Sequence, residues 1–297
     1  MTRHLLEIDD LAPADLIEIL DRAEEPAPPP ALAGEGMALL FEKPSARTRN
    51  SMEMAVVQLG GHPVTIRPDE VGLDQRESTE DVARTLGCYH AMIGARVFEH
   101  SKIERLAANA GVPVVNMLSD DGHPLQALAD LLTIRQVFGE LEGRTVAYIG
   151  DANNVARSLG LGCGLAGLEF RVASPAGYRF DAGDIDRLRA VGVEPQVSDH
   201  PMDAARGADV IYADVWTSMG QEDERPSRLD AFAGYTVDDE MMGATAPGGV
   251  FLHCLPAHPG EEVTRGVLDG STSRIWQQAE NRMHAARGAL WWLLDQP

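Results

Sequence analysis

Residues 37–59 read MALLFEKPSARTRNSMEMAVVQL, an apolar run followed by a polar loop and a segment with helical apolar spacing. The apolar run at 37–41 predicts a buried strand, and the apolar residues at positions 52, 55, 56 and 59 predict a helix. A strand followed by a helix is the repeating unit of an α/β fold. The loop Ser45-Ala46-Arg47-Thr48-Arg49 therefore lies where a strand ends and a helix begins.

This strand-to-helix junction has the features of an anion-binding site. The first N–H groups of a helix lack intrahelical partners, and the helix dipole favours negative charge there. Arginine guanidinium groups match phosphate oxygens, and Ser45 and Thr48 add hydroxyls. The run lacks the G-x-x-x-x-G-K-[ST] pattern of a P-loop, so it does not predict nucleotide hydrolysis. A capped helix with surface arginines is the alternative that the motif alone leaves open.

The charge balance argues against a nucleic-acid partner. The formal net charge is −21 over 297 residues, so the surface repels phosphate backbones, and phosphate binding requires a local basic pocket. Lys43 and Lys102 are the only lysines, and the other basic residues are arginines. Such a composition fits a protein from a high-salt cytoplasm. It fits an acidic protein from an ordinary GC-rich organism equally well.

We expect a soluble, cytoplasmic protein without metal. The first ten residues are too acidic and too briefly apolar for a signal peptide, and no later run reaches the length of a membrane span. The cysteines Cys88, Cys163 and Cys254 form no C-x-x-C pair, which argues against a disulfide framework and a structural zinc site. His253 and His258 flank Cys254, but no further Cys or His pair at ligand spacing lies nearby.

Strand-like and helix-like segments alternate, which predicts an α/β fold with two domains, each a central parallel sheet flanked by helices. In the first half we expect strands at 37–41, 91–96 and 112–116 and helices at 13–22, after Ser78 and at 124–138. The helix after Ser78 is expected to bury Val82, Leu86 and Tyr89. In the second half we expect strands at 145–149, 170–173, 194–197, 210–213 and 250–252. The expected domains are 1–138 and 139–279, with the amphipathic helix at 280–297 packing back on the first.

Gly150 directly follows the strand expected at 145–149, as a glycine does in dinucleotide-binding folds. Only this glycine of the G-x-G-x-x-G pattern is in place. Ser174-Pro175 stands at the end of the next strand, where a ribose-binding acid is required. We therefore do not expect NAD or FAD.

Polar side chains fall just after the predicted strands. Open α/β sheets bind ligands at the carboxyl ends of their strands, so we expect these loops to line one cleft between the two domains. Each residue has an ordinary alternative role, such as a helix cap for His123, a strand-end cap for Asp214 or a buried thiol for Cys254. The residues in question are Ser45 to Arg49, Arg96, His123, Asn154, Asp214, His253 and Cys254.

Four ordered motifs resemble those of the aspartate/ornithine carbamoyltransferase family, and the resemblance covers nearly the whole chain. Residues 45–49 resemble the S-T-R-T-R run of that family, and His123-Pro124-Leu125-Gln126 matches H-P-x-Q. Residues 214–220, DVWTSMG, and residues 253–256, HCLP, resemble the ornithine branch. The aspartate branch carries H-P-L-P at the latter place.

The resemblance implies transfer of a carbamoyl group from carbamoyl phosphate to the δ-amine of L-ornithine, without metal or organic cofactor, in the cleft between the domains. The implied catalytic residues are Arg47, Arg96, His123 and Cys254. The implied carbamoyl phosphate site comprises Ser45, Ala46, Arg47, Thr48, Arg96, His123, Gln126, Cys254, Leu255 and Arg282. The implied ornithine site comprises Asn154, Asp214, Ser218 and Met219.

The chain departs from the family pattern at two places. Ala46 replaces the usual Thr, at a position that mainly offers its backbone N–H. Many ornithine enzymes place a Gln from a neighbouring subunit where Gly72 aligns, and we expect Gln75 or Arg76 to take its role. Family members are trimers or assemblies of trimers, so the resemblance implies a homo-oligomer.

Two other functions stay open. One is carbamoyl transfer to another amine such as putrescine. It is disfavoured because Asp214 and Ser218-Met219 suit the zwitterion of an α-amino acid. The other is a non-catalytic relative with the same fold. Retention of the four implied catalytic residues weighs against it, because a scaffold has no need of oxyanion donors.

Overall fold

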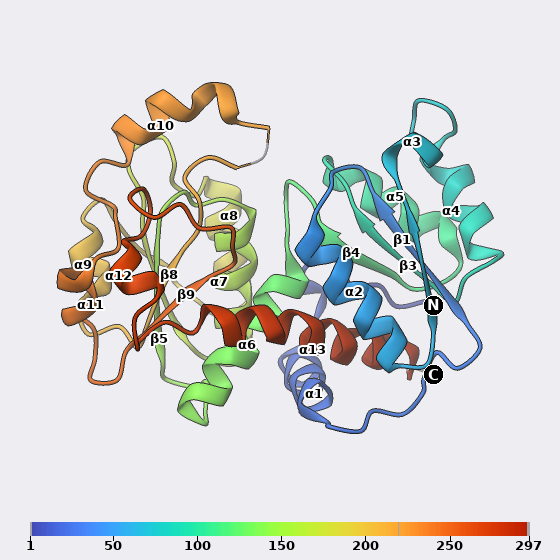
Figure 1. Cartoon of the computed structure of the whole chain (residues 1–297), viewed down its shortest axis with the longest axis horizontal. Coiled ribbons are helices and arrows are strands. Elements are labelled where there is room, and N and C mark those ends of the chain that lie inside the picture. The colour runs from blue at the N-terminus through green and yellow to red at the C-terminus, as the bar shows by residue number, and fades with distance from the viewer. Residues whose placement is uncertain (1, 219, 296–297) are drawn as a thin grey trace. The chain divides into compact units, whose positions relative to one another are not determined.

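The structure is a computed structural model that describes residues 2–218 and 220–295 (Figure 1). The chain forms two compact units, one made of Met1–Ala129 and Asn281–Pro297, and the other of Asp130–Glu280. The division falls within helix α6 (Pro124–Phe138), whereas the sequence-based limit of 138 stands at its end. The predicted α/β class with parallel sheets and flanking helices is confirmed.

The first unit has a four-stranded parallel sheet in the order β2-β1-β3-β4. The strands are β1 (Gly36–Phe41), β2 (His62–Ile66), β3 (Met92–Arg96) and β4 (Val114–Leu118). Strand β4 begins two residues after its predicted start. Strand β2 was not predicted, because it is a partly exposed edge strand that contains Pro63.

Helices cover both faces of this sheet. Ala38 and Leu40 of β1 pack with buried side chains of α4 (Thr79–Gly87) and α5 (His100–Ala110). Alternation along the strand turns Met37 and Leu39 to the opposite face. In Figure 1 helix α2 (Ala46–Gln58) lies on that side. The remaining elements outside the C-terminal helix are η1 (Ile8–Asp10), α1 (Pro13–Glu24) and α3 (Pro68–Val71).

Tyr89 was expected on the buried face of α4, and this expectation is wrong. The helix ends at Gly87, so the helical spacing from Val82 no longer applies at Tyr89, whose side chain is 72% exposed. Val82 is buried as expected. Ser78 does cap the helix, because its side chain accepts a hydrogen bond from the N–H of Asp81.

The C-terminal helix α13 (Ile275–Leu294) begins five residues before its predicted start at 280. From residue 281 onward it belongs to the first unit, where it lies beside α1 (Figure 1). Gly288 allows this approach, because a Cβ there would lie 2.5 Å from the carbonyl oxygen of Ile19. Arg287 adds hydrogen bonds to the carbonyl oxygen of Ala23 and to Gln58 Oε1.

The second unit has a five-stranded parallel sheet in the order β7-β6-β5-β8-β9. The strands are β5 (Thr145–Ile149), β6 (Glu169–Ala173), β7 (Gln196–Ser198), β8 (Val210–Ala213) and β9 (Val250–His253). All five were predicted within two residues at their starts. The helical elements are α7 (Asn154–Ala166), α8 (Ala182–Ala190), α9 (Pro201–Ala205), η2 (Glu222–Glu224), α10 (Arg225–Ala231), α11 (Asp239–Gly243) and α12 (Arg265–Leu268).

The core of the second unit lies on both faces of its sheet. One face packs Ile149 and Ile211 with Met241 and other buried residues from α9, α11 and α12. Figure 1 shows α7 and α8 on the opposite side. No helix in the part of the chain that the structure describes is long and apolar enough to cross a membrane.

Candidate active site

The strand order of each sheet marks where a ligand binds. In the first unit β2 lies on one side of β1, and β3, the next strand along the chain, lies on the other. In the second unit the same reversal occurs at β5, between β6 and β8. Open α/β sheets bind ligands at such switch points, outside the carboxyl ends of the strands. The loops after β1, β3, β5 and β8 are therefore the candidate site loops.

In the first unit the loop after β1 and the end of β3 meet at Thr48. Ser45 caps α2, since its Oγ accepts a hydrogen bond from the N–H of Thr48 and donates one to Thr48 Oγ1. Arg96, the last residue of β3, donates from Nη1 to Thr48 Oγ1 over 3.3 Å. Both Thr48 and Arg96 are buried. The predicted phosphate loop thus connects directly with the predicted oxyanion arginine.

The two arginines of the loop have different surroundings. Arg49 forms an ion pair with Glu53 one helical turn later, with Nε and Oε1 2.8 Å apart. Arg47 is exposed on the first turn of α2, next to Ala46 at the helix start. The guanidinium of Arg49 is thus engaged by a carboxylate of its own helix, and the role of Arg47 as a phosphate ligand stays a prediction.

His123 lies immediately before α6 and is 5% exposed. Burial lowers the pKa of its imidazole well below the usual 6.5, and the positive charges of Arg282, Arg96 and Lys43 act in the same direction. The imidazole is therefore neutral at neutral pH. A neutral ring amid cationic side chains is suited to donate a hydrogen bond to an oxygen that becomes negative.

Arg282 reaches this region from α13. Its Nη1 donates a hydrogen bond to Oε1 of Gln126, which lies in the first turn of α6. Both side chains are buried. The structure therefore brings six predicted residues into one hydrogen-bonded or electrostatically coupled region of the first unit, namely Ser45, Thr48, Arg96, His123, Gln126 and Arg282.

Lys43 also belongs to this region, and the sequence analysis did not include it. Burial lowers the pKa of its ammonium group, and the positive charge of Arg96 acts in the same direction. The Nζ atom lies over the ring of Phe98, 4.5 Å from the ring centroid. The available signal was its position two residues before Ser45, as one of only two lysines.

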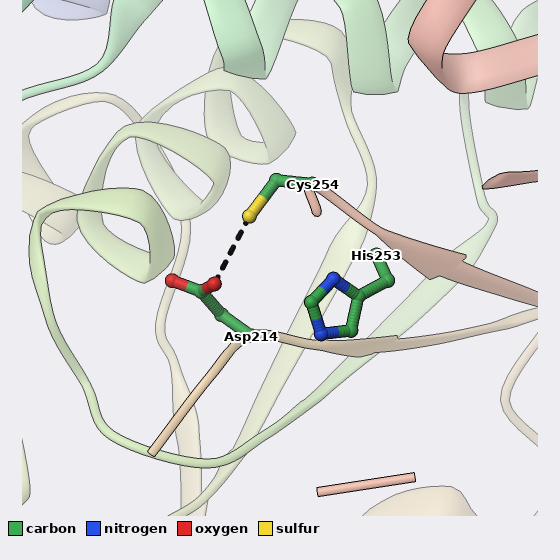
Figure 2. A group of neighbouring side chains, drawn as sticks. All are labelled: Asp214, His253 and Cys254. Atoms are coloured by element: carbon green, nitrogen blue, oxygen red, sulfur yellow. Dashed lines mark hydrogen bonds between the residues drawn. The ribbon is translucent and has the colours of Figure 1, made fainter. Parts of the chain in front are cut away.

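In the second unit Asp214 and Cys254 follow neighbouring strands, β8 and β9. The Cys254 thiol donates a hydrogen bond to Asp214 Oδ1 over 3.0 Å (Figure 2). The same carboxylate oxygen accepts from the N–H of Val215 over 2.8 Å. Asp214 is buried, and its other oxygen accepts from Asn153 Nδ2 over 3.2 Å. Two residues that were predicted separately, Asp214 and Cys254, are thus in direct contact.

Asn153 was missed, because the sequence analysis selected Asn154. Asn153 is the N-cap of α7, and its Oδ1 accepts from the N–H groups of Val155 and Ala156. Asn154 is the first residue of that helix, and its role in binding stays a prediction. The N–H of Ser218 donates to Gln221 Oε1 over 3.0 Å. Met219 lies outside the described residues.

Leu255, after Cys254, has a φ of +60° in the left-handed region. Its N–H donates to Nδ1 of His253, and His253 Nε2 lies 3.1 Å from Oε1 of the fully buried Glu262. Asp214, His253 and Cys254 each place one potential metal-ligand atom within 4.8 Å of the others, as do His258, Glu261 and Glu262. Both ring nitrogens of His253 already have protein partners, so a metal ion at the first group would compete with them. The expectation of no metal stays a prediction.

Comparison with known proteins identifies the family. The carbamoyl-P binding domain of aspartate/ornithine carbamoyltransferase matches residues 3–136, and the Asp/Orn binding domain matches residues 142–293. The chain belongs to the aspartate/ornithine carbamoyltransferase family. Arg282 falls within the second matched range, although α13 packs there with the first unit.

Relatives in this family match along nearly their whole length. An ornithine carbamoyltransferase of Acidothermus cellulolyticus is 50% identical over 306 residues, which cover 99% of this chain and 97% of the relative. The crystal structure of the ornithine carbamoyltransferase of Thermus thermophilus has a TM-score of 0.91 at 46% identity, covering 99% of this chain and 100% of that chain. The structure of the ornithine carbamoyltransferase from Pyrococcus furiosus has a TM-score of 0.92 at 41% identity, and the match covers 97% of this chain and 96% of that chain.

Proposed function

We propose that the chain is an ornithine carbamoyltransferase, which transfers the carbamoyl group of carbamoyl phosphate to the δ-amine of L-ornithine and gives L-citrulline and phosphate. The observation that carries the proposal is that each unit contains a half-site suited to one of the two substrates. A neutral His123 among three cationic side chains suits carbamoyl phosphate. The buried Asp214 carboxylate in the DVWTSMG motif suits the α-ammonium of an amino acid.

The phosphate group binds at the start of α2 in this proposal. The backbone N–H groups at the start of α2 and the guanidinium of Arg47 supply the donors, and Ser45 caps the helix that presents them. Lys43 adds positive charge from the loop before α2. These groups form a local basic pocket, which a chain of net charge −21 needs in order to attract a phosphate.

The carbamoyl group is held by donors around its carbonyl oxygen. Arg96, Thr48 and His123 donate to this oxygen, whose negative charge grows as a tetrahedral intermediate forms. Gln126 binds the carbamoyl amide, while Arg282 orients Gln126 and contacts carbamoyl phosphate. Loss of one donor of this kind typically lowers the rate by about a hundred- to a thousand-fold.

Ornithine binds at the second half-site. Asp214 pairs with its α-ammonium, and Asn154, Ser218 and Met219 bind the rest of the amino acid. The deprotonated δ-amine forms a C–N bond to the carbamoyl carbon, and the C–O bond to phosphate then breaks. The amine loses a proton, and phosphate leaves with the electron pair. No metal or organic cofactor is needed, because phosphate is a good leaving group and positioning lowers the barrier.

The rate should rise with pH, because only the unprotonated δ-amine attacks. The direct test measures citrulline and phosphate together, starting from carbamoyl phosphate and L-ornithine. We expect equal amounts of the two products. Release of phosphate without citrulline would contradict transfer, and no turnover would favour a non-catalytic relative.

We further propose a cytoplasmic homotrimer, or an assembly of trimers, that acts in arginine biosynthesis or in arginine breakdown. The acidic, lysine-poor composition supports adaptation to high salt, where screening reduces self-repulsion. In that case the midpoint of thermal unfolding rises from dilute buffer to molar KCl. Full stability in dilute buffer would contradict the adaptation.

A further inference from the structure

Asn153 connects the start of α7 with the carboxylate of Asp214. Its Oδ1 accepts hydrogen bonds from the N–H groups of Val155 and Ala156, at 2.9 and 3.2 Å. The hydroxyl of the buried Tyr148 donates to the same oxygen over 3.4 Å. Its Nδ2 donates to Asp214 Oδ2 over 3.2 Å. One side chain thus serves a helix end and a buried carboxylate together.

The helix end fixes which way the Asn153 amide faces. The first N–H groups of a helix require an acceptor, so the amide oxygen must lie toward Val155 and Ala156. The NH₂ group then lies on the other side of the amide, where it meets Asp214. The direction of this donor is therefore set by the backbone of α7 rather than by the substrate.

Donors hold both oxygens of the Asp214 carboxylate. Oδ1 accepts from the N–H of Val215 and from Cys254, and Oδ2 accepts from Asn153. A carboxylate with donors on both oxygens is restrained from rotating about its Cβ–Cγ bond. Of these donors, Asn153 alone is a side chain that is itself anchored to a helix N-terminus.

We infer that Asn153 is a positioning residue for recognition of the amino-acid substrate: it holds the Asp214 carboxylate in the orientation that pairs with the α-ammonium. The inference rests on the proposed function. It predicts that the loss of Asn153 impairs ornithine binding through Asp214, with little effect on carbamoyl phosphate, whose proposed donors Thr48, Arg96 and His123 lie in the first unit.

Two substitutions of Asn153 keep its capping of α7 but remove its hydrogen bond to Asp214. Serine caps a helix as well as asparagine does, but its single short hydroxyl does not replace the amide NH₂ that reaches Asp214. Aspartate also caps, but it sets a second carboxylate against Asp214, and like charges at this distance repel. Both variants keep a capping group at α7, so the helix should remain formed.

The experiment compares Asn153→Ser and Asn153→Asp with the wild type. We expect the KM for ornithine to rise by about ten-fold or more in Asn153→Ser, since hydrogen bonds to charged groups have contributions of this size. A larger rise is expected in Asn153→Asp. The KM for carbamoyl phosphate and the thermal midpoint should stay close to wild type. The Kd for L-norvaline, which lacks the δ-amine, should rise by the same factor when measured with saturating carbamoyl phosphate.

A capping control excludes general destabilisation. Asp181 caps α8 in the same unit through its side chain and is not bonded to Asp214. Asp181→Ala should lower the thermal midpoint without raising the KM for ornithine. An unchanged KM and norvaline Kd in Asn153→Ser, with an active wild type, would overturn the inference. An equal rise in the KM of both substrates would also overturn it. An inactive wild type would instead contradict the proposed function.

Discussion

Arg96 at the end of β3 donates a hydrogen bond of 3.3 Å to Thr48 Oγ1 in the first turn of α2. The same oxygen accepts from the hydroxyl of Ser45 over 3.1 Å. A threonine hydroxyl has two acceptor sites and one proton to donate. Since both acceptor sites are used within the protein, the Thr48 proton is available to a substrate oxygen. The register of β1 and β3, which pairs Phe41 with Arg96, creates this arrangement.

Replacement of Thr48 therefore tests the carbamoyl phosphate half-site. Thr48→Val keeps the volume of the side chain but removes the hydroxyl and leaves the buried Arg96 without this acceptor. We expect kcat/KM for carbamoyl phosphate to fall by about a hundred-fold or more. Thr48→Ser keeps the hydroxyl and should retain most of the activity. Similar kinetics for Thr48→Val and the wild type would show that this hydroxyl does not contact the substrate.

The contact between Cys254 and Asp214 leads to a prediction for the ornithine half-site. Cys254→Ala removes the thiol that donates a hydrogen bond to Asp214 Oδ1 over 3.0 Å. We expect a higher KM for ornithine and a lower kcat, because the resemblance to the family also implies a catalytic role for Cys254. Cys254→Ser restores a donor and should recover part of the loss. Steady-state kinetics at varied ornithine concentration should rank the wild type above Cys254→Ser and Cys254→Ser above Cys254→Ala. Equal activity of the two variants would contradict this prediction.

His123 gives the protein a defined pH dependence of stability. Its folded pKa is lowered well below 6.5 by burial and by Arg282, Arg96 and Lys43. Below pH 6.5 the unfolded chain binds a proton at this residue that the folded chain does not, so stability falls as the pH falls toward the folded pKa. The slope for one such group is at most about 1.4 kcal/mol per pH unit.

The variant His123→Gln isolates this contribution. The free energy of unfolding, from urea titrations across this range, should depend less on pH in the variant than in the wild type below pH 6.5. At higher pH the two curves should run parallel, which serves as the internal control. Parallel curves throughout the acid range would indicate that His123 is protonated normally in the folded protein.

The loop after α3 distinguishes the two residues proposed to replace the family glutamine. Arg76 donates from Nη1 to the carbonyl oxygens of Asp69 and Glu70, both over 3.3 Å. Its guanidinium therefore stabilises the backbone of its own segment. We therefore expect Gln75 to reach the neighbouring active site in a trimer. Gln75→Ala should raise the KM for carbamoyl phosphate, and Arg76→Ala should mainly lower the thermal midpoint. If Gln75→Ala leaves that KM unchanged, Gln75 does not have this role.

Local sequence patterns were sufficient to predict most of the strands and the strand ends at which the candidate site residues lie. Strand β5 has its predicted bounds, 145–149, because a mostly apolar run between polar turns leaves little ambiguity. The same applies to Pro124, which begins α6 as expected for a proline at the first position of a helix. Edge strand β2 escaped prediction because its exposure blurs the apolar pattern.

The side-chain contacts were beyond the reach of local patterns. Asn153 and Asn154 are indistinguishable by type, and only the N-cap geometry assigns the amide of Asn153 to Asp214. Lys43 has an ordinary position in a loop, and only the fold sets it beside Arg96 and His123. Arg282 and Gln126 are 156 positions apart in the sequence, so their hydrogen bond depends on the return of α13 to the first unit.

The most direct test of the central claim is an acceptor competition. Carbamoyl phosphate is supplied with L-ornithine, putrescine and L-aspartate at equal concentrations, in dilute buffer and again in concentrated KCl, and the carbamoylated products are separated and quantified. The account predicts citrulline as the main product, because Asp214 pairs with an α-ammonium that putrescine lacks. Predominant carbamoylation of putrescine or aspartate, or the absence of all three products in both buffers, would contradict it.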